Sequence, residues 1–158
     1  LDEDAENFHI DLSAPSAGSL SDSRGTLTIN DDDAAPSLSV DAGGCTVFEG
    51  NFGNTPCITP VRLSAASGKA ISFTVQTADS TAHSGSDYQS QSTNVRILAG
   101  GTTLALPVQV IGDTLIEADE AFEVRLTAVQ NASPAALTGM AVILNDDNAA
   151  LIFANGFE

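Results

Sequence analysis

The sequence has little positive charge: 5 lysine and arginine residues stand against 21 aspartate and glutamate residues, giving a formal net charge of −16. Proteins that bind nucleic acid need basic patches to contact the phosphates, so this balance excludes nucleic acid as a partner. An anionic membrane surface is disfavoured for the same reason. The longest apolar run, LALPVQVI at residues 104–111, is far too short to cross a bilayer, so we expect no membrane insertion.

Cysteine is scarce as well, because only Cys45 and Cys57 occur. Their spacing suits one disulfide around a short loop, and no second pair is present to complete a zinc site. Two free buried thiols are the alternative. The low lysine content and the abundance of serine, threonine and glycine favour the oxidised, exported form. We therefore expect an extracellular or cell-surface location, and we interpret the chain, which starts at Leu1 without a signal segment, as a mature portion or a fragment.

Apolar and polar residues alternate with a period of two in several short segments. The clearest examples are residues 61–65, 71–75, 104–110 and 122–128, and clusters of glycine, serine, aspartate and asparagine separate them. No segment shows a helical stripe. Pro107, inside one of these patterns, indicates an edge strand or a bulge. The sequence therefore predicts an all-β fold whose antiparallel strands close into a sandwich or barrel.

The chain also contains an internal repeat. Phe8 matches Phe122, and the difference of 122 − 8 = 114 residues aligns the surrounding segments without a gap. The same offset pairs Glu3 with Glu117, Glu6 with Glu120, Leu12 with Leu126, Gly25 with Gly139, Ile29 with Ile143, Asp32 with Asp146 and Asp33 with Asp147. A period of this length indicates tandem domains and not a short-repeat solenoid. We expect residues 1–33 to be the C-terminal strands of a preceding unit, residues 34–148 a complete domain, and residues 149–158 a C-terminal tail.

Five pieces of the complete domain occur in an order that is characteristic of one family. They are FEG at 48–50, TADSTAHSGSDY at 77–88, the glycine pair at 100–101, VIGDTLIEADEAFEVRL at 110–126 and AVILNDD at 141–147. Together they resemble the Calx-β domain of sodium–calcium exchangers, integrin β4 and many bacterial surface proteins. The resemblance implies a seven-stranded antiparallel β-sandwich of the immunoglobulin-like type, which agrees with the alternation. The first 33 residues look like the C-terminal hairpin of another copy.

The resemblance also implies a metal site, since calcium-binding members hold their ions in loops at one end of the sandwich. The ligands carried over by position are Glu49, Asp79, Asp113, Glu117, Glu120, Asp146 and Asp147. In the preceding unit, the matching acidic residues are Glu3, Glu6, Asp32 and Asp33. Ca²⁺ takes about six to eight oxygens, whereas carboxylates gathered without a cation repel one another and raise one another's pKa. Ca²⁺ is therefore the expected cofactor, and acidic loops that hold no ion are the alternative.

Three positions depart from the strongest binders of that family. Gly112 and Thr114 flank Asp113 where those members carry a run of aspartates, and Asn145 stands where a third terminal aspartate is common. An asparagine still offers a carbonyl oxygen but removes a charge. We therefore expect about one or two ions, bound weakly at around 10⁻⁴ M.

A catalytic role finds little support in the sequence. His83 lies near the serines and the aspartate of segment 84–87, but all of them fall in one short turn, whereas a catalytic triad converges from separate elements. We expect Asp87 and Tyr88 to fix this turn by hydrogen bonds to the backbone. The two glutamates of segment 117–120 resemble the acid–base pair of glycosidases, but the chain has no tryptophan to stack on a sugar. The sequence predicts a protein that is not an enzyme.

Two functions fit these expectations. One is a calcium-binding structural or adhesive module of an exported bacterial surface protein, whose partners are neighbouring copies of itself or adjacent Calx-β modules. The alternative is a regulatory calcium sensor that alters a partner domain on ion binding. A sensor needs a cytosolic setting and a dense set of ligands. The expected disulfide counts against a cytosolic setting, and the thinned aspartate clusters count against a dense set of ligands.

Two segments outside the complete domain bear on assembly. The hairpin expected in residues 1–33 has Phe8, Ile10 and Leu12 on one side, which strands of another copy or module would cover. Repeated head to tail, such strand complementation builds a filament. The closing segment LIFANGFE is similar to a short C-terminal signature of exported proteins in some Gammaproteobacteria, and we expect Phe153 and Phe157 to pack it across an edge.

Overall fold

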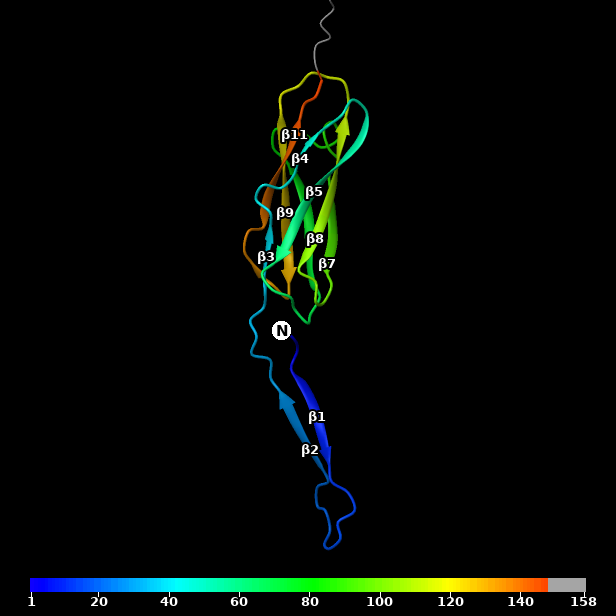
Figure 1. The fold of residues 1–158 in the computed structure, drawn as a ribbon, viewed down its shortest axis with the longest axis vertical. Coiled ribbons are helices and arrows are strands. Elements are labelled where there is room, and N and C mark those ends of the chain that lie inside the picture. The colour runs from blue at the N-terminus through cyan, green and yellow to red at the C-terminus, as the bar shows by residue number, and fades with distance from the viewer. Residues whose placement is uncertain (148–158) are drawn as a thin grey trace, which may run out of the picture.

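The computed structural model describes residues 1–147, which form a β-sandwich body and a separate two-stranded hairpin (Figure 1). Within these residues there is no helix, and hence none that is long and apolar enough to cross a membrane. The all-β fold class is confirmed. The tail expected at residues 149–158 lies outside the described residues.

Two sheets form the body. The first has the order β10-β3-β5-β8 and consists of β3 (Ser37–Val40), β5 (Gly53–Leu63), β8 (Thr103–Gly112) and β10 (Ser133–Pro134). The second has the order β4-β11-β9-β6-β7 and consists of β4 (Thr46–Phe48), β6 (Ile71–Asp79), β7 (Ser92–Ile97), β9 (Glu120–Gln130) and β11 (Thr138–Leu144). If β3 and β4 are counted as halves of one strand, these are the expected seven strands and the two-residue β10.

The first strand of the body crosses from one sheet to the other. Its first half, β3, pairs antiparallel with β5, whereas its second half, β4, pairs parallel with β11. Gly44 lies at the crossing with a φ of 51°, and a Cβ there would lie 1.8 Å from the carbonyl oxygen of Met140. Only glycine fits this backbone and this close approach. The crossing brings Glu49, which follows β4 directly, to the end of the body where β11 also ends.

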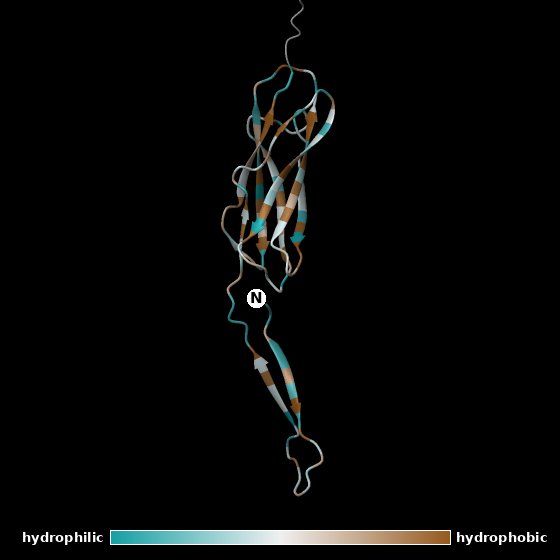
Figure 2. Ribbon diagram, in the orientation of Figure 1, coloured by the Kyte–Doolittle hydropathy of each residue, from teal (hydrophilic) through white to brown (hydrophobic). Residues whose placement is uncertain are grey.

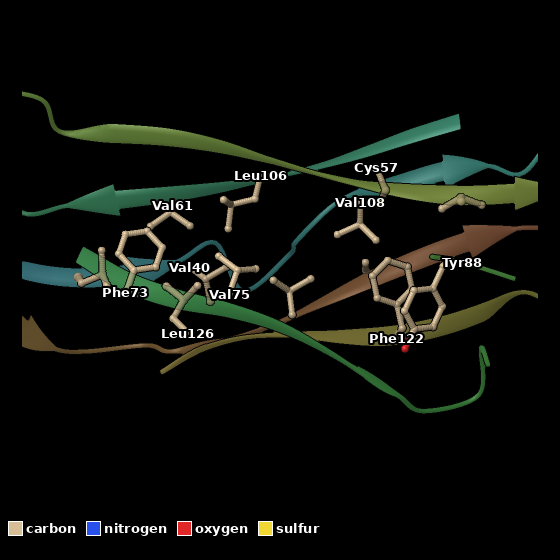
Figure 3. Close-up of a cluster of buried hydrophobic side chains, with 14 of the residues drawn as sticks. Val40, Cys57, Val61, Phe73, Val75, Tyr88, Leu106, Val108, Phe122 and Leu126 are labelled. Atoms are coloured by element: carbon tan, nitrogen blue, oxygen red, sulfur yellow. The ribbon is translucent and has the colours of Figure 1, made fainter. Parts of the chain in front are cut away.

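The hydrophobic core lies between the two sheets, as the period-two pattern predicts (Figure 3). Val61 and Val108 reach it from the first sheet, and Phe73 and Phe122 reach it from the second; all four are buried. Each such side chain stabilises the fold by about 1.5–3 kcal/mol when it leaves water. Pro107 lies on β8, an edge strand of the first sheet, which confirms the edge position predicted from the sequence.

A disulfide joins Cys45, just before β4, to Cys57 on β5, with the two Cα atoms 5.7 Å apart. The predicted bridge is therefore present. It links the two sheets, because β4 belongs to the second sheet and β5 to the first. It also closes a short loop that contains Glu49.

The N-terminal hairpin consists of β1 (Glu6–Asp11) and β2 (Arg24–Ile29) and projects from the body along the long axis (Figure 1). Its register repeats the register of β9 and β11, since Phe8 lies opposite Leu27 as Phe122 lies opposite Ala141. All six residue pairs of the hairpin obey the offset of 114 residues. The hairpin is thus a local copy of the last long hairpin of the body.

The two hairpins differ in what covers them. On the β9–β11 hairpin the apolar side faces the core and is buried. On the β1–β2 hairpin the matching side is exposed at 43–57% of each side chain's surface, and it consists of Phe8, Ile10, Leu12, Leu27 and Ile29. We call these five residues the open face; the apolar stretches of both strands are visible in Figure 2.

Candidate metal site

Carboxylates gather at the end of the body that lies away from the hairpin (Figure 1). Glu49 follows β4, Asp113 follows β8, and Asp146 and Asp147 follow β11. Glu120 opens β9, which runs in the opposite direction to β11 and therefore starts where β11 ends. The sandwich topology thus brings acids that are far apart in the sequence to one place.

Glu49 is the most deeply buried acid of this group, with 4% of its surface exposed. Two hydrogen bonds fix its backbone. The N–H of Glu49 donates to the carbonyl oxygen of Leu144 at 3.2 Å, and the Thr55 hydroxyl donates to the carbonyl oxygen of Glu49 at 3.1 Å. Burial first, and then the charges of Asp113, Glu117, Asp147 and Asp146, raise the pKa of its carboxyl to about 7. Near neutral pH the fold therefore resists the charged form of Glu49 unless a cation offsets the charge.

Asp147 is 9% exposed, and its two carboxylate oxygens differ in their contacts within the described part of the chain. Its Oδ1 accepts a hydrogen bond from Asn51 Nδ2 at 2.5 Å, whereas its Oδ2 is buried and has no hydrogen-bond partner among residues 1–147. Beside it, the N–H of Gly50 donates to Asp146 Oδ1 at 3.1 Å. Asn145 holds the turn, because its side chain accepts from the N–H of Asp147 and donates to the carbonyl oxygen of Asp147. A buried carboxylate oxygen needs a cation or a hydrogen-bond donor to satisfy it.

A second group lies beside the first. Carboxylate oxygens of Asp87, Glu117 and Glu120 lie within 4.8 Å of one another, in an arrangement that could hold a metal ion. Burial raises the pKa of Glu120 to about 7, with a hydrogen bond to Asp87 as the next cause. Burial likewise raises the pKa of Glu117, and the charges of Asp87, Asp113 and Asp147 add to the effect. Glu117 is thus close to both groups.

Asp87 is a site residue that sequence reasoning missed. The sequence led us to expect that it fixes its turn, and it does so, since the N–H of His83 donates to Asp87 Oδ2 at 2.7 Å. It is also buried, at 8% exposure, and it faces the two glutamates. Its place in the family-like segment TADSTAHSGSDY was the signal that could have identified it.

Asp79 is placed differently from the other expected ligands. Its Oδ1 accepts hydrogen bonds from the Tyr88 hydroxyl at 2.5 Å and from the N–H of Ser84 at 2.9 Å. These bonds, led by that of Tyr88, lower the pKa of Asp79. Tyr88 stacks in turn on Phe122, with ring centroids 4.1 Å apart (Figure 3). Asp79 therefore anchors a core tyrosine, and its role as a metal ligand stays a prediction.

Gly112 occupies a position with no room for a side chain. A Cβ there would lie 2.1 Å from the carbonyl oxygen of Gly50 and 2.6 Å from that of Glu49. An aspartate at this position could enter only if the segment bearing Glu49 moved. Next to it, Asp113 Oδ1 accepts from the N–H of Leu115 at 2.6 Å, which fixes the start of the acidic loop.

The acids expected to serve the preceding unit lie at the junction between the hairpin and the body. Glu3, Glu6, Asp32 and Asp33 are all exposed. The N–H of Glu3 donates to Asp31 Oδ2 at 3.0 Å, and Asp33 pairs with the amino group of Leu1. The offset of 114 residues gives these acids no counterpart of Glu49, Asp87 or Asp113 within the chain, so residues 1–33 do not repeat the whole acidic group of the body, and their role as metal ligands stays a prediction.

The geometry defines a class of protein: a β-sandwich that collects carboxylates from several loops at one end. The Calx-beta domain family matches residues 31–152, and the chain belongs to this family of calcium-binding β-sandwich modules. The donor set fits Ca²⁺, which prefers several carboxylate oxygens from flexible loops, and the unpartnered oxygen of Asp147 lies among them.

Solved structures show the same fold. The apo-form of the Calx CBD1 domain is 25% identical with a TM-score of 0.61, and the match covers 72% of this chain and 100% of that one. CBD12 from CALX1.2 is 26% identical with a TM-score of 0.64, covering 72% of this chain and 46% of that one. The calcium binding domain CBD12 of CALX1.1 is 26% identical with a TM-score of 0.63, and the match covers 71% of this chain and 47% of that one. This chain therefore spans about half of each CBD12 structure, and the comparison with curated proteins finds no match.

Proposed function

We propose that the body is a calcium-binding structural module, without catalytic activity, of an exported protein. The observation that carries the proposal is the buried carboxylate pair: Asp147 has an unpartnered oxygen, and Glu49 is buried among like charges. Buried charges in proteins are paired or coordinate metals. A divalent cation would satisfy both side chains together.

The proposed ligands form two groups that meet at Glu117. The first comprises Glu49, Asp113, Asp147 and the adjacent Asp146; the second comprises Asp87, Glu117 and Glu120. Two neighbouring groups, with Glu117 close to both, suit about one or two Ca²⁺ ions, each completed to about six to eight oxygens by carbonyl groups and water. Mg²⁺ fits this less well, because it demands a tight octahedral shell.

Thermal unfolding tests the proposal. Ca²⁺ that binds only the folded state should raise the melting temperature of the metal-free protein with increasing concentration, and Mg²⁺ at the same concentration should do much less. Asp147→Asn is the sharp variant, because it removes the charge and keeps the bond partner of Asn51, and it should reduce the calcium response. A melting temperature that is indifferent to both Ca²⁺ and chelator would contradict the proposal.

The affinity separates a structural module from a sensor. The regulatory alternative gains support from the solved CBD12 structures, one of which is named a calcium binding domain. However, the disulfide favours an oxidising compartment, so we place the protein outside the cell or at the cell surface. A dissociation constant near 10⁻⁴ M or weaker suits an extracellular module, whereas submicromolar binding would favour the sensor.

We further propose that residues 1–33 end a preceding Calx-β unit. The hairpin register and the open face support this, because every open-face residue matches a residue that the body buries in its core. The sheet of the body is already covered by its own hairpin, so the open face needs strands from another unit. Strands of an adjacent module, or of a second copy in a head-to-tail filament, would complete it by strand complementation, and such an assembly suits an adhesive role.

A further inference from the structure

Asp2, near the start of the described chain, is hydrogen-bonded to the body at a place separate from the metal site. Asp2 is only 7% exposed, and it bridges to the loop between β5 and β6. Its carbonyl oxygen accepts from the N–H of Gly68 at 2.7 Å and from the Ser67 hydroxyl at 3.0 Å. The same hydroxyl lies 2.8 Å from Asp2 Oδ2. Backbone and side chain of Asp2 are therefore both held by the body.

Charge complementarity marks this contact. Lys69 is the single lysine of the sequence, and its Nζ lies 3.1 Å from Asp2 Oδ1 and 3.4 Å from Asp4 Oδ1. In a chain with a net charge of −16, this lysine is thus placed between two acids of the hairpin unit. The side chains of Lys69 and Asp2 are 25% and 7% exposed, so solvent screens the Lys69–Asp2 pair less than a fully exposed pair.

The two surfaces also approach closely at Gly68. A Cβ at that position would lie 3.1 Å from the Cβ of Glu3 and 3.2 Å from the carbonyl oxygen of Asp2. A larger residue would therefore push the two parts of the molecule apart. We call the contact of Asp2 and Asp4 with Ser67, Gly68 and Lys69 the clasp.

We infer that the clasp is an inter-unit joint: the β5–β6 loop of a Calx-β unit is a docking surface for an Asp-x-Asp segment at the acidic end of the unit before it. The lysine supplies the cation at this joint, so the orientation of the two units is fixed without Ca²⁺. This inference rests on the proposed assignment of residues 1–33 to a preceding unit.

The clasp has a direction. By the offset of 114 residues, Asp2 and Asp4 correspond to Ile116 and Ala118 in the body. The body therefore offers the lysine side of the clasp to a preceding unit but does not carry the Asp-x-Asp side at its own acidic end. Ile116 is 60% exposed at that end, so another unit placed there would meet an apolar side chain where this joint has a carboxylate.

Backbone relaxation by NMR tests the joint on the whole chain. In the wild type, the amides of the hairpin should tumble with the body, and the amide of Gly68 should exchange slowly with solvent, both with and without chelator. Lys69→Met, which removes the charge, and Gly68→Val, which pushes the surfaces apart, should each give the hairpin a shorter correlation time and should speed exchange at residue 68 at least tenfold.

Arg24→Met is the matched control, because it removes the same charge from the exposed Arg24–Asp11 pair inside the hairpin. It should leave the joint unchanged. A hairpin that tumbles independently in the wild type would overturn the inference, as would one that loosens when Ca²⁺ is removed but not in Lys69→Met. The calcium-induced rise in melting temperature of the body, measured on the same samples, reports separately on the proposed function.

Discussion

At the residue scale, Glu49 is a carboxyl group that the fold buries beside several other acids. Such a group is stable when protonated or when a cation lies next to it, and unstable when charged and alone. Protons and Ca²⁺ should therefore compete for it, and the apparent calcium affinity should rise as pH rises through 7.

The pH dependence of stability follows from the same group. The pKa of Glu49 is about 7 in the folded protein against an ordinary value of 4.5, so the folded state binds this proton more tightly. Its contribution to stability is fully present below about pH 4.5 and is lost as pH rises through about 7. In chelator, we expect the melting temperature of the wild type to fall more steeply across this window than that of Glu49→Gln.

Calcium provides the control for this experiment. With saturating Ca²⁺ the wild type should keep its stability at neutral pH, because the cation takes the place of the proton. Glu120 also has a pKa of about 7, but it is present in both proteins and its effect cancels in the comparison. If the melting temperatures of the wild type and Glu49→Gln fall in parallel as pH rises in chelator, the fold does not disfavour the charged form of Glu49.

Two aspartates of one segment separate ligand from anchor. Asp87→Asn removes a charge from the acidic group and should weaken calcium binding about tenfold, or about 1.4 kcal/mol. Asp79→Asn removes the same charge but weakens the bond to Tyr88, so it should lower the free energy of unfolding by about 1 kcal/mol and change calcium affinity less. Titration calorimetry and denaturant unfolding measure the two effects, and the opposite order would restore Asp79 as a ligand.

At the element scale, the approach of β8 to the segment after β4 limits the metal site. Although Gly112→Asp adds a carboxylate to the acidic end, it should weaken calcium binding here. The new side chain would push Glu49 and Gly50 away, at a cost of about 1–3 kcal/mol. Thr114→Asp adds the same charge at an exposed position two residues on and serves as the control. Calcium binding that tightens in Gly112→Asp and not in Thr114→Asp would contradict this account.

The strands could largely be predicted from the sequence, but the burial and the meeting of the site's carboxyl groups could not. Alternating residues such as those around Phe122 show which side of a strand is buried. The offset of 114 residues predicted the β1–β2 hairpin as well. Asp87 was missed because its neighbours in the sequence explain it as a turn residue. Its second role, and the burial of Glu49, depend on strands that meet only in the folded protein.

At the scale of the whole molecule, a compact body is followed, toward the N-terminus, by a hairpin with an open face (Figure 1). Exposed apolar patches of this kind mark interaction sites. We expect the full chain to associate through this face at high concentration. Phe8→Asp should abolish the association, and His9→Asp, which changes an exposed residue on the opposite side of β1, should not.

Light scattering and a melting curve distinguish the outcomes. The melting temperature of the body should be the same in both variants, because its core contains no residue of the hairpin. Association that persists unchanged in Phe8→Asp would show that another surface connects the molecules. Growth of long particles by the wild type would favour strands exchanged between copies over a preceding module of the same protein.

The disulfide has a mechanical consequence for a chain that is pulled from both ends. Tension that arrives at Cys45 from the N-terminal side passes directly through the sulfur bridge to Cys57. The eleven residues between them (57 − 45 − 1 = 11) therefore carry no load. Strand β4 and Glu49 belong to this unloaded segment, so a stretched module keeps its metal ligand in place until other strands give way. In the reduced protein the same pull would act on β4 and would drag Glu49 out of the site first.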